Sequence, residues 1–237
     1  MKRILTLLFL LGLLFLIALN AYWLNGSRTV QLFGEIYPRV NTHQKIVALT
    51  LDDGPNEKID TILNILKFHK VKATFFPIGS LMEDRLSDIT RIVKDGHEVG
   101  NHSYTHRILS LKSYETIRQE IEPTDRLLRK AGYTGEIHFR PPYGMKMFML
   151  PFYLKQHDRK TIMWDLSPEG DPALNMDPAK LAQFVIDNTT NGSIILLHPM
   201  NPGREASLNA LDPIIRGLKA KGFVFKTVSE LLASREN

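Results

Sequence analysis

Cysteine is absent from this chain of 237 residues. Its absence excludes disulfide bonds, thiol nucleophiles and thiolate zinc sites together. A metal site in this chain would therefore be built from histidine nitrogen and carboxylate oxygen. The absence is compatible with a domain outside the cytoplasm, but it does not require one.

The chain also carries little net charge outside its N-terminal stretch. The formal net charge is +5, but Lys2, Arg3 and Arg28 belong to an N-terminal stretch that has no acids. The rest of the chain then carries only about +2, which is too little to indicate a surface for nucleic acid. The sequence indicates no protein partner either. With 43% hydrophobic residues the chain can bury one full core, which favours a single catalytic domain.

The N-terminal run over residues 4–24 is almost free of polar residues. About 20 helical residues cross the core of a bilayer, so this run is long enough to span one. Lys2 and Arg3 precede the run, and their charges would hold the N-terminus in the cytoplasm. We therefore expect residues 1–24 to anchor an extracytoplasmic domain in the membrane, either in a periplasm or at the cell surface.

A cleaved signal segment is the alternative, and it would make the protein secreted. Small residues are poorly placed for cleavage, because the stretch 19–21 fails at one of the required positions. Tyr22 and Trp23 instead fit the aromatic belt of a membrane interface. We favour an uncleaved anchor, followed by a linker over residues 25–44 and one folded domain over residues 45–237.

Short β-branched runs alternate with helical patterns from residue 45 onward, which is typical of an α/β fold with a parallel sheet. Candidate strands are 46–51, 73–76, 97–100, 137–139, 161–164, 193–197 and 223–225. Candidate helices are 59–69, 86–94, 114–129, 178–188 and 208–219. Strands and helices in this alternation point to a barrel-like closure, in which chemistry gathers at the carboxyl ends of the strands.

Two adjacent carboxylates, Asp52 and Asp53, follow the first candidate strand. The turn at Gly54 and Pro55 lets the chain leave the strand geometry and bring both side chains toward one pocket. One carboxylate can then bind a metal while the other stays free as a base. Taken alone, such a sequence is more often only a polar turn.

His102 and His106 are four residues apart, so on a helical turn both imidazoles would face the same way. An isolated pair of this spacing is often a coincidence of the surface. Together with Asp53 it gives two histidines and one carboxylate, which leaves positions open for water and substrate. One divalent metal ion is expected there, zinc by default, although cobalt, nickel, manganese or iron would suit the same ligands.

Two further residues follow candidate strands. Arg140 precedes two prolines, and its planar guanidinium could hold Asp52 ionised and oriented, unless it is simply a surface arginine in a proline turn. His198 follows a buried strand, and Pro199 turns the chain directly after it. A hydrogen-bonded core histidine is the alternative for His198.

These segments resemble the motifs of the polysaccharide deacetylases, the NodB-homology or carbohydrate esterase family 4 enzymes, over roughly residues 45–232. The resemblance implies a distorted (β/α)7 barrel of the NodB-homology type, here preceded by the N-terminal transmembrane helix. It makes Asp52 the general base, His198 the general acid and Arg140 the residue that orients Asp52. The metal ligands that it implies are Asp53, His102 and His106.

The substrate-binding residues that we expect are Tyr143, Trp164 and Leu197. By resemblance, the backbone N–H of Tyr143 helps to hold the oxyanion. Trp164 and Leu197 are candidates for the wall of an acetyl pocket, and both are equally compatible with ordinary core positions.

The fourth motif does not match the family. The family shows D-x-x-D-W there, whereas this chain reads from Trp164 through Asp165 to Asp171 without a tryptophan after either aspartate. The carboxylate that adjusts the pKa of His198 could come from either aspartate. We favour Asp165 because it lies closer to the strand end. The departure affects the expected shape of the substrate groove more than the expected chemistry.

The function that these features favour is metal-dependent removal of N-acetyl groups from N-acetylhexosamine units of a cell-envelope or extracellular polysaccharide. The expected partners are such a glycan, as polymer or oligomer, and the membrane. Two alternatives remain open. One is a membrane-tethered glycan-binding protein without activity, and the other is an esterase or amidase that acts on an acyl substrate outside the glycans.

Overall fold

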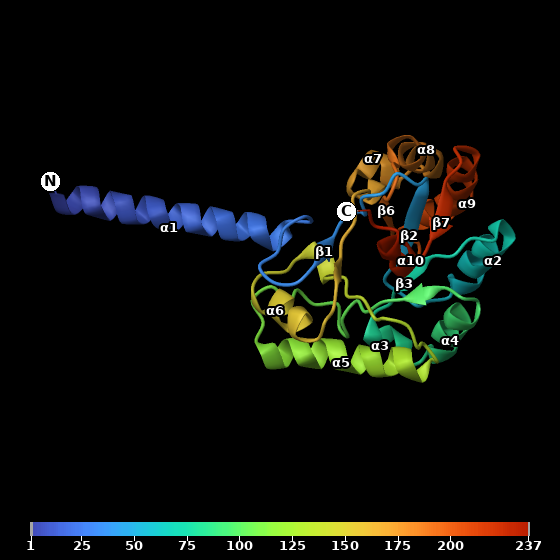
Figure 1. Ribbon diagram of the computed structural model, residues 1–237, viewed down its shortest axis with the longest axis horizontal. Coiled ribbons are helices and arrows are strands. Elements are labelled where there is room, and N and C mark those ends of the chain that lie inside the picture. The colour runs from blue at the N-terminus through green and yellow to red at the C-terminus, as the bar shows by residue number, and fades with distance from the viewer. Residues whose placement is uncertain (1, 237) are drawn as a thin grey trace.

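The computed structural model describes residues 2–236. A long helix, α1 (Lys2–Gly26), projects from a folded domain that holds the other elements (Figure 1). None of its residues is buried, and it is the one helix within residues 2–236 that is long and apolar enough to cross a membrane. At about 1.5 Å per residue its 25 residues exceed the roughly 30 Å hydrocarbon core of a bilayer.

The main sheet is parallel and has β2 (Ile46–Asp52) at its centre. Its other strands are β3 (Thr74–Phe76), β4 (Glu98–Val99), β6 (Ile194–Leu197) and β7 (Val224–Lys226). β2 pairs with β3, β6 and β7, and every one of its residues is buried. A strand buried on both faces reads as a continuous apolar run, which is why no alternation marks β2 in the sequence.

A second, two-stranded sheet pairs β1 (Ile36–Tyr37) with β5 (Thr161–Ile162) in parallel. A linker was expected over residues 25–44, yet β1 lies in that range and Val40 is 1% exposed. The segment packs because its few apolar residues find a strand edge at β5. No sequence pattern marks this strand, since a two-residue strand has no period to detect.

The candidate strand at 137–139 is reduced to isolated parallel bridges, from Phe139 to Asn101 and to Thr161. Pairing ends at Arg140 because the two prolines that follow have no N–H to donate. A further bridge joins Leu166 to Ile195. These bridges continue the parallel order from β4 toward β6, as a barrel needs, while the closed seven-stranded barrel itself stays a prediction.

The five expected helices are present, and their caps follow the sequence. Asp177 caps the helix that begins at Pro178 by accepting hydrogen bonds from Ala179 and Lys180. Thr227 and Glu230 form a capping box on a short further helix that begins at Val228 and was not among the five. The helices after α1 are α2 (Ile59–His69), α3 (Gly79–Met82), α4 (Leu86–Lys94), α5 (Tyr114–Lys130), α6 (Met149–Gln156), α7 (Pro172–Asn175), α8 (Pro178–Asn188), α9 (Glu205–Ala220) and α10 (Val228–Ala233). Two 3₁₀ turns are η1 (Pro142–Gly144) and η2 (Pro168–Gly170).

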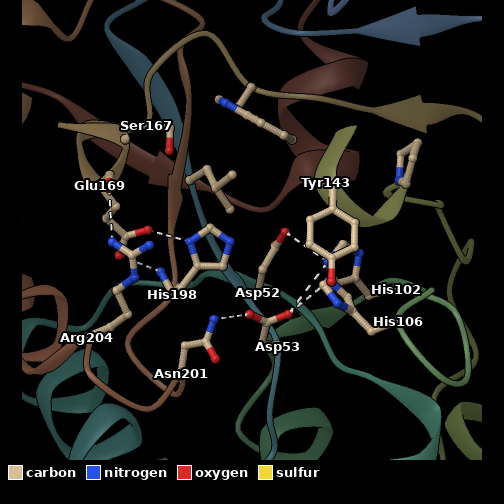
Figure 2. A pocket seen from close by; sticks show the side chains of 14 residues that line it. Asp52, Asp53, His102, His106, Tyr143, Ser167, Glu169, His198, Asn201 and Arg204 are labelled. Atoms are coloured by element: carbon tan, nitrogen blue, oxygen red, sulfur yellow. Dashed lines mark hydrogen bonds and ion pairs between the residues drawn. The ribbon is translucent and has the colours of Figure 1, made fainter. Parts of the chain in front are cut away.

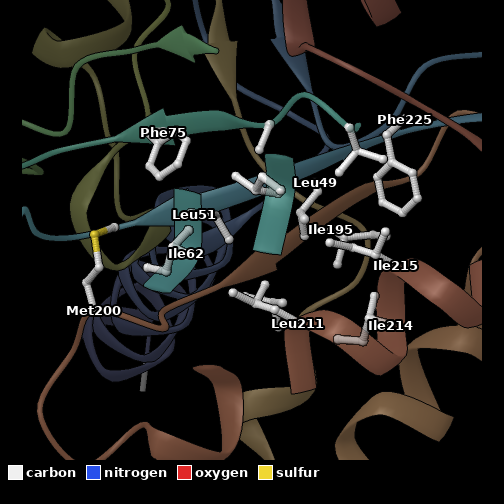
Figure 3. Packing of buried hydrophobic residues seen from close by; sticks show 14 of the residues in the cluster. Leu49, Leu51, Ile62, Phe75, Ile195, Met200, Leu211, Ile214, Ile215 and Phe225 are labelled. Atoms are coloured by element: carbon white, nitrogen blue, oxygen red, sulfur yellow. The ribbon is translucent and has the colours of Figure 1, made fainter. Parts of the chain in front are cut away.

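The largest core cluster lies between the main sheet and the helices that cover it (Figure 3). Leu49 and Ile195 from β2 and β6 belong to this cluster, together with Leu211 and Ile215 from α9. Met200 packs at its edge, under the turn that follows β2. The core thus supports the carboxyl ends of β2 and β6, where the polar motifs begin.

Candidate active site

One cavity of about 310 Å³ opens at the carboxyl ends of the strands (Figure 2). It collects side chains from widely separated parts of the chain: Asp52, Asp53, His102, His106, Pro141, Tyr143, Trp164, Ser167, Glu169, Gly170, Leu196, His198, Asn201 and Arg204. The cavity therefore brings together most of the expected site residues. Arg140 is not in its wall but lies directly behind Asp52.

Leu197 does not line the cavity, which corrects one expectation. It is fully buried in the core cluster, and Leu196 reaches the cavity in its place. Successive side chains of a strand point to opposite faces, so only one of two neighbours can face the cavity. Trp164 does line the cavity, as expected.

The two carboxylates reach one cavity because the chain leaves the strand between them. Asp52 is the last residue of β2, whereas Asp53 and Gly54 adopt left-handed backbone angles, with φ of 65° and 70°. A Cβ on Gly54 would clash with Sδ of the buried Met200, and this clash together with the positive φ favours glycine at this turn. The sequence-based interpretation of this turn agrees with the structure.

The two histidines do not lie on a helical turn, which corrects the geometry expected from their spacing. Residues 101–106 form an irregular loop in which Ser103 and His106 have positive φ. Asn101 Oδ1 accepts a hydrogen bond from Ser103 N–H at 2.8 Å, and Ser103 Oγ accepts one from His106 N–H at 3.0 Å. These local bonds fold the loop so that the imidazole rings of His102 and His106 lie 4.8 Å apart.

Asp53, His102 and His106 fit a divalent cation. One ligand atom from each residue lies within 4.8 Å of the others, and Asp53 Oδ1 is buried without a hydrogen-bond partner. The Nε2 atoms of His102 and His106 are 3.7 and 3.4 Å from this oxygen. A buried carboxylate oxygen facing two imidazole nitrogens is left unsatisfied unless a proton or a cation lies between them.

The protonation of these groups also suits a metal site. His102 Nδ1 lies 2.7 Å from the carbonyl of Arg140, so Nδ1–H donates there and Nε2 keeps its lone pair for the cavity. Burial lowers the pKa of His102 and of His106, which favours the neutral form that binds metal. Burial raises the pKa of Asp53, and a bound cation would offset that effect.

Asp52 is held by Arg140, as expected from the sequence. The guanidinium donates to Asp52 Oδ1 at 2.6 Å and to Thr50 Oγ1 at 2.8 Å, and it lies 4.2 Å above the ring of Phe76. Arg140 is completely buried, so this charge-assisted bond is not weakened by water. Asp52 is thereby fixed through one oxygen, and Oδ2 is 3.6 Å from Nε2 of His102.

Tyr143 lies in η1 with a left-handed φ of 58° and forms part of the cavity wall. Its ring is 63% exposed and packs beside His106, with centroids 4.8 Å apart. The ring therefore covers one of the candidate metal ligands. The oxyanion role of its backbone N–H stays a prediction.

Glu169, rather than either aspartate, is the acid bound to His198. Its carboxylate contacts Nδ1 of the imidazole and also accepts a hydrogen bond from the backbone N–H of His198 at 2.9 Å. Asp165 instead accepts hydrogen bonds from Ser193 Oγ at 2.8 Å and Ile194 N–H at 2.9 Å.

The choice of Asp165 was wrong because the chain after Asp165 comes back to His198 only at the following turn, η2. Pro168 begins η2, and this turn carries Glu169, 5% exposed, back against His198. Asp171 is exposed and caps α7 by accepting a hydrogen bond from Ala173 N–H at 2.8 Å. Pro168 was the available signal, since proline commonly opens a helical turn and places the next residues at a fixed angle.

Glu169 also determines the charge of His198. Burial lowers the pKa of the imidazole, but the hydrogen bond and the charge of Glu169 outweigh it, so the pKa of His198 lies above its ordinary value. Burial likewise opposes ionisation of Glu169, but its contacts with His198 bring the pKa of Glu169 below its ordinary value. With Nδ1–H bound to Glu169, Nε2–H of the imidazolium is the remaining donor.

Two more residues of the cavity were not expected from the sequence. Asn201 donates a hydrogen bond to Asp53 Oδ2 at 2.8 Å, which leaves Oδ1 toward the histidines. Arg204 donates to the backbone carbonyl of Glu169 at 2.9 Å. Both lie within six residues after His198, in the loop before α9. This position in the loop was the only sign in the sequence that they belong to the cavity.

The fold and the site define an α/β protein with a candidate base, a candidate acid and a candidate cation site at the carboxyl ends of parallel strands. This is the arrangement of a hydrolase. The family model described as polysaccharide deacetylase matches residues 39–160. The chain belongs to the polysaccharide deacetylase family, and its resemblance to NodB-homology and carbohydrate esterase family 4 proteins is confirmed.

Two curated relatives show the extent of the similarity. A peptidoglycan-N-acetylglucosamine deacetylase of Bacillus cereus is 31% identical over 200 residues, which cover 84% of this chain and 93% of that protein. The peptidoglycan-N-acetylmuramic acid deacetylase PdaC of Bacillus subtilis is 34% identical over 194 residues, which cover 81% of this chain and 40% of that protein. These alignments are longer than the family match, which ends before Glu169 and His198.

Solved structures are similar in fold. The peptidoglycan N-acetylglucosamine deacetylase Bc1960, in complex with a hydroxamate-type benzamide, superposes with a TM-score of 0.76 at 30% identity, covering 84% of this chain and 93% of that one. BA3943 of Bacillus anthracis, described as a CE4 family pseudoenzyme, also has a TM-score of 0.76, at 32% identity, covering 87% of this chain and 72% of that one. The family thus includes a pseudoenzyme of the same fold.

Proposed function

We propose that this protein is a metal-dependent hydrolase that removes N-acetyl groups from N-acetylhexosamine units of a cell-envelope or extracellular polysaccharide. One observation carries the proposal: a carboxylate fixed by an arginine and a histidine fixed by a glutamate line the same cavity. Binding a glycan requires neither pair. The relatives named as peptidoglycan deacetylases support a glycan as substrate.

Asp53, His102 and His106 would hold the cation, with zinc as the first choice and cobalt, nickel, manganese or iron as others that suit these ligands. Such a cation, when bound, polarises a carbonyl and lowers the pKa of a water molecule to about 7 in favourable sites. Asn201 keeps Asp53 oriented through the oxygen that faces away from the histidines.

Asp52 is the proposed base. Its Oδ1 is occupied by Arg140, so Oδ2 is the oxygen that takes the proton from the attacking water. Arg140 also orients Asp52, because the guanidinium donates to Oδ1 from a completely buried position behind the carboxylate. The backbone N–H of Tyr143 is the proposed donor to the oxyanion, a contribution of about 3 to 4 kcal/mol for one such donor.

His198 is the proposed acid. Its Nδ1 is held by Glu169, so Nε2 is free to give a proton to the amine as the acetyl group leaves. The hydrogen bond and the charge of Glu169 raise the pKa of His198, which favours the protonated form that can give this proton. General acid catalysis of this kind contributes roughly 100-fold to 10,000-fold.

A membrane-tethered glycan-binding protein without activity is the second candidate, because a similar structure belongs to a pseudoenzyme. The presence of both the base and the acid, each with its own partner, favours an enzyme. An esterase or amidase acting on another acyl substrate is a third candidate, supported by the altered fourth motif, in which Glu169 takes the position of the expected aspartate.

We further infer that α1 anchors the protein in a membrane with the domain on the extracytoplasmic side. Its length, its exposed apolar surface and the Lys2 and Arg3 charges before it support this placement. If the segment is cleaved as a signal peptide, the domain is secreted. The mass of the mature protein distinguishes the two.

Acetate release tests the proposed reaction. Full-length protein in detergent is incubated with N-acetylglucosamine oligomers and with small acyl esters and amides, each with added divalent metal and with chelator. Metal-dependent release from the oligomers supports the proposal. Release only from small acyl substrates supports the third candidate, and metal binding or glycan binding without any release supports the second.

A further inference from the structure

The chain that follows α1 is bound to the wall of the active cavity. Lys146 lies two residues after η1 and is 1% exposed. Its backbone N–H donates to the carbonyl of Asn25 at 2.9 Å, and its ammonium group donates to the carbonyl of Ser27. Within residues 2–236 no carboxylate forms an ion pair with this buried ammonium, so its charge is held by the chain next to α1.

A second contact joins the same stretch to Trp164. The Arg28 guanidinium lies 6.0 Å from the centre of the Trp164 ring and donates to the Trp164 carbonyl at 3.4 Å. Trp164 and Tyr143 both line the cavity. Gly26 ends α1, and the two steps from it to Arg28 span at most about 7 Å. The wall of the cavity therefore begins directly beside the end of α1.

The rest of this stretch is also attached to the domain. Ser27 Oγ accepts a hydrogen bond from Val30 N–H at 3.1 Å, which turns the chain back along the domain. β1 then pairs with β5, and Val40 is buried. A flexible tether would lack such contacts, so the domain is held in a defined orientation to α1.

Exposed apolar side chains surround this junction. Val30, Leu32 and Phe148 are 43%, 49% and 51% exposed, and the ring of Phe33 packs on Phe148 with centroids 5.1 Å apart. Trp23, near the end of α1, is 58% exposed. Figure 1 shows α6, which follows Phe148, on the side of the domain where α1 leaves it. Apolar and aromatic side chains grouped beside a membrane helix are typical of a surface that meets the bilayer interface.

We propose that Val30, Leu32 and Phe148 form a junction surface that rests on the lipid bilayer, and that the enzyme acts on N-acetylated glycan held at the membrane surface. Glycan attached to lipid is the substrate class that this placement fits. The cavity lies next to the end of α1, so polymer far from the membrane is out of its reach. This inference rests on the proposed deacetylase function and on α1 spanning the membrane.

The contact with lipid can be measured without any substrate. Because the native chain has no cysteine, Phe148→Cys provides a unique site for a fluorophore, and Phe68→Cys provides a matched control. Phe68 is 79% exposed on α2, which Figure 1 shows on the side of the domain away from α1. Full-length protein is placed in phosphatidylglycerol and phosphatidylethanolamine vesicles that contain brominated lipid. We expect strong quenching at position 148 and little at 68, and equal quenching at both would overturn the proposal.

The substrate preference is tested with N-acetylglucosamine tetramers coupled to lipid through a short or a long spacer in the same vesicles. We expect the native chain to release acetate about tenfold faster from the short-spacer substrate than from the long-spacer one. The anchor keeps the cavity close to the bilayer, so its effective concentration is higher at the height of the short-spacer glycan. A flexible insertion of about 15 residues after Gly26 has a mean span of about 20 Å and should bring the ratio of the two rates close to one. An unchanged ratio would overturn the proposal.

Two controls separate this inference from the proposed function. The same insertion between Thr134 and Gly135, in an exposed loop, should leave the ratio at its native value. Soluble tetramer should be hydrolysed at similar rates by the native chain and both insertion variants. If no variant releases acetate from any tetramer, the proposed function fails, and the quenching measurement still decides where the domain lies.

Discussion

The proposed acid, His198, and the proposed base, Asp52, are held by partners of opposite charge. Asp52 is bound through one oxygen to a buried guanidinium, whereas His198 is bound to a buried carboxylate that raises the pKa of the imidazole. Partners of opposite charge therefore prepare one residue to accept a proton and the other to donate one. At the scale of single residues, this difference between the partners of Asp52 and His198 is the main argument for catalysis.

Replacing Glu169 by glutamine should shift the pH profile. His198 acts as an acid only when protonated, and Glu169 raises its pKa, so activity falls as the pH rises through that raised value. In Glu169→Gln the pKa of His198 falls, and we expect the alkaline limb of kcat to move to lower pH. The measurement is the pH dependence of acetate release at saturating substrate.

Asp165→Asn is the matched control for this prediction, since Asp165 bonds to Ser193 and Ile194 and not to His198. Its alkaline limb should stay where the native enzyme has it. An unmoved limb in Glu169→Gln, or an equal shift in Asp165→Asn, would contradict the role given to Glu169.

Asn201 should contribute to metal affinity without binding the metal. It donates to Asp53 Oδ2, and loss of a partner that orients a ligand typically lowers affinity about 10-fold to 100-fold. We expect such a loss in Asn201→Ala, measured by competition with a chromogenic chelator. Asn188→Ala, on the exposed face of α8, should bind metal as the native protein does. Equal affinities in the two variants would refute the assignment.

At the scale of elements, the turn after β2 determines whether the cavity forms. Gly54→Ala combines a positive φ with a clash against the side chain of Met200, and we expect it to lower the free energy of unfolding by about 1 to 3 kcal/mol. Gly203→Ala isolates the backbone effect, because Gly203 has a similar φ of 75° and no atom within 4 Å of the added Cβ. Thermal or urea unfolding compares them, and equal losses would mean that the Met200 contact is unimportant.

The elements that carry the site were largely predictable, and the loops that shape it were not. The strand before Asp52 and the one before His198 are continuous apolar runs, which can be recognised from composition without any periodicity. The His102–His106 loop depends on backbone N–H groups that donate to Asn101 Oδ1 and Ser103 Oγ, and spacing alone does not reveal these bonds. β1 is two residues long, and its pairing with β5 joins segments more than 120 residues apart in the chain.

The errors at single residues have the same origin, because the sequence does not show how a loop folds back in space. Asp165 was chosen over Asp171 by nearness in sequence to a strand end, and Glu169, which lies between them, was not considered. The turn η2 brings Glu169 against His198. Leu197 was chosen where Leu196 faces the cavity, because the sequence fixes the alternation along a strand but not its phase. Burial of both faces of β6 removed the polar residues that would have shown the phase.

At the scale of the whole molecule, the stretch after α1 is part of the domain. A chain that begins at residue 40 loses the carbonyl partners of Lys146 and the Arg28 contact with Trp164. Leaving a buried charged group without partners costs about 1 to 3 kcal/mol or more. We expect the chain that begins at residue 40 to unfold at a lower temperature than one that begins at residue 25. We also expect it to be less active. Equal unfolding temperatures would show that this stretch is dispensable.

Acetate release from N-acetylglucosamine oligomers by the full-length native protein and by Asp52→Asn and His198→Ala, at equal metal loading, tests the central claim most directly. The account predicts release by the native protein and a loss of roughly 100-fold or more in each variant, with metal still bound. Native-like release by either variant, or no release by the metal-loaded native protein, would contradict it.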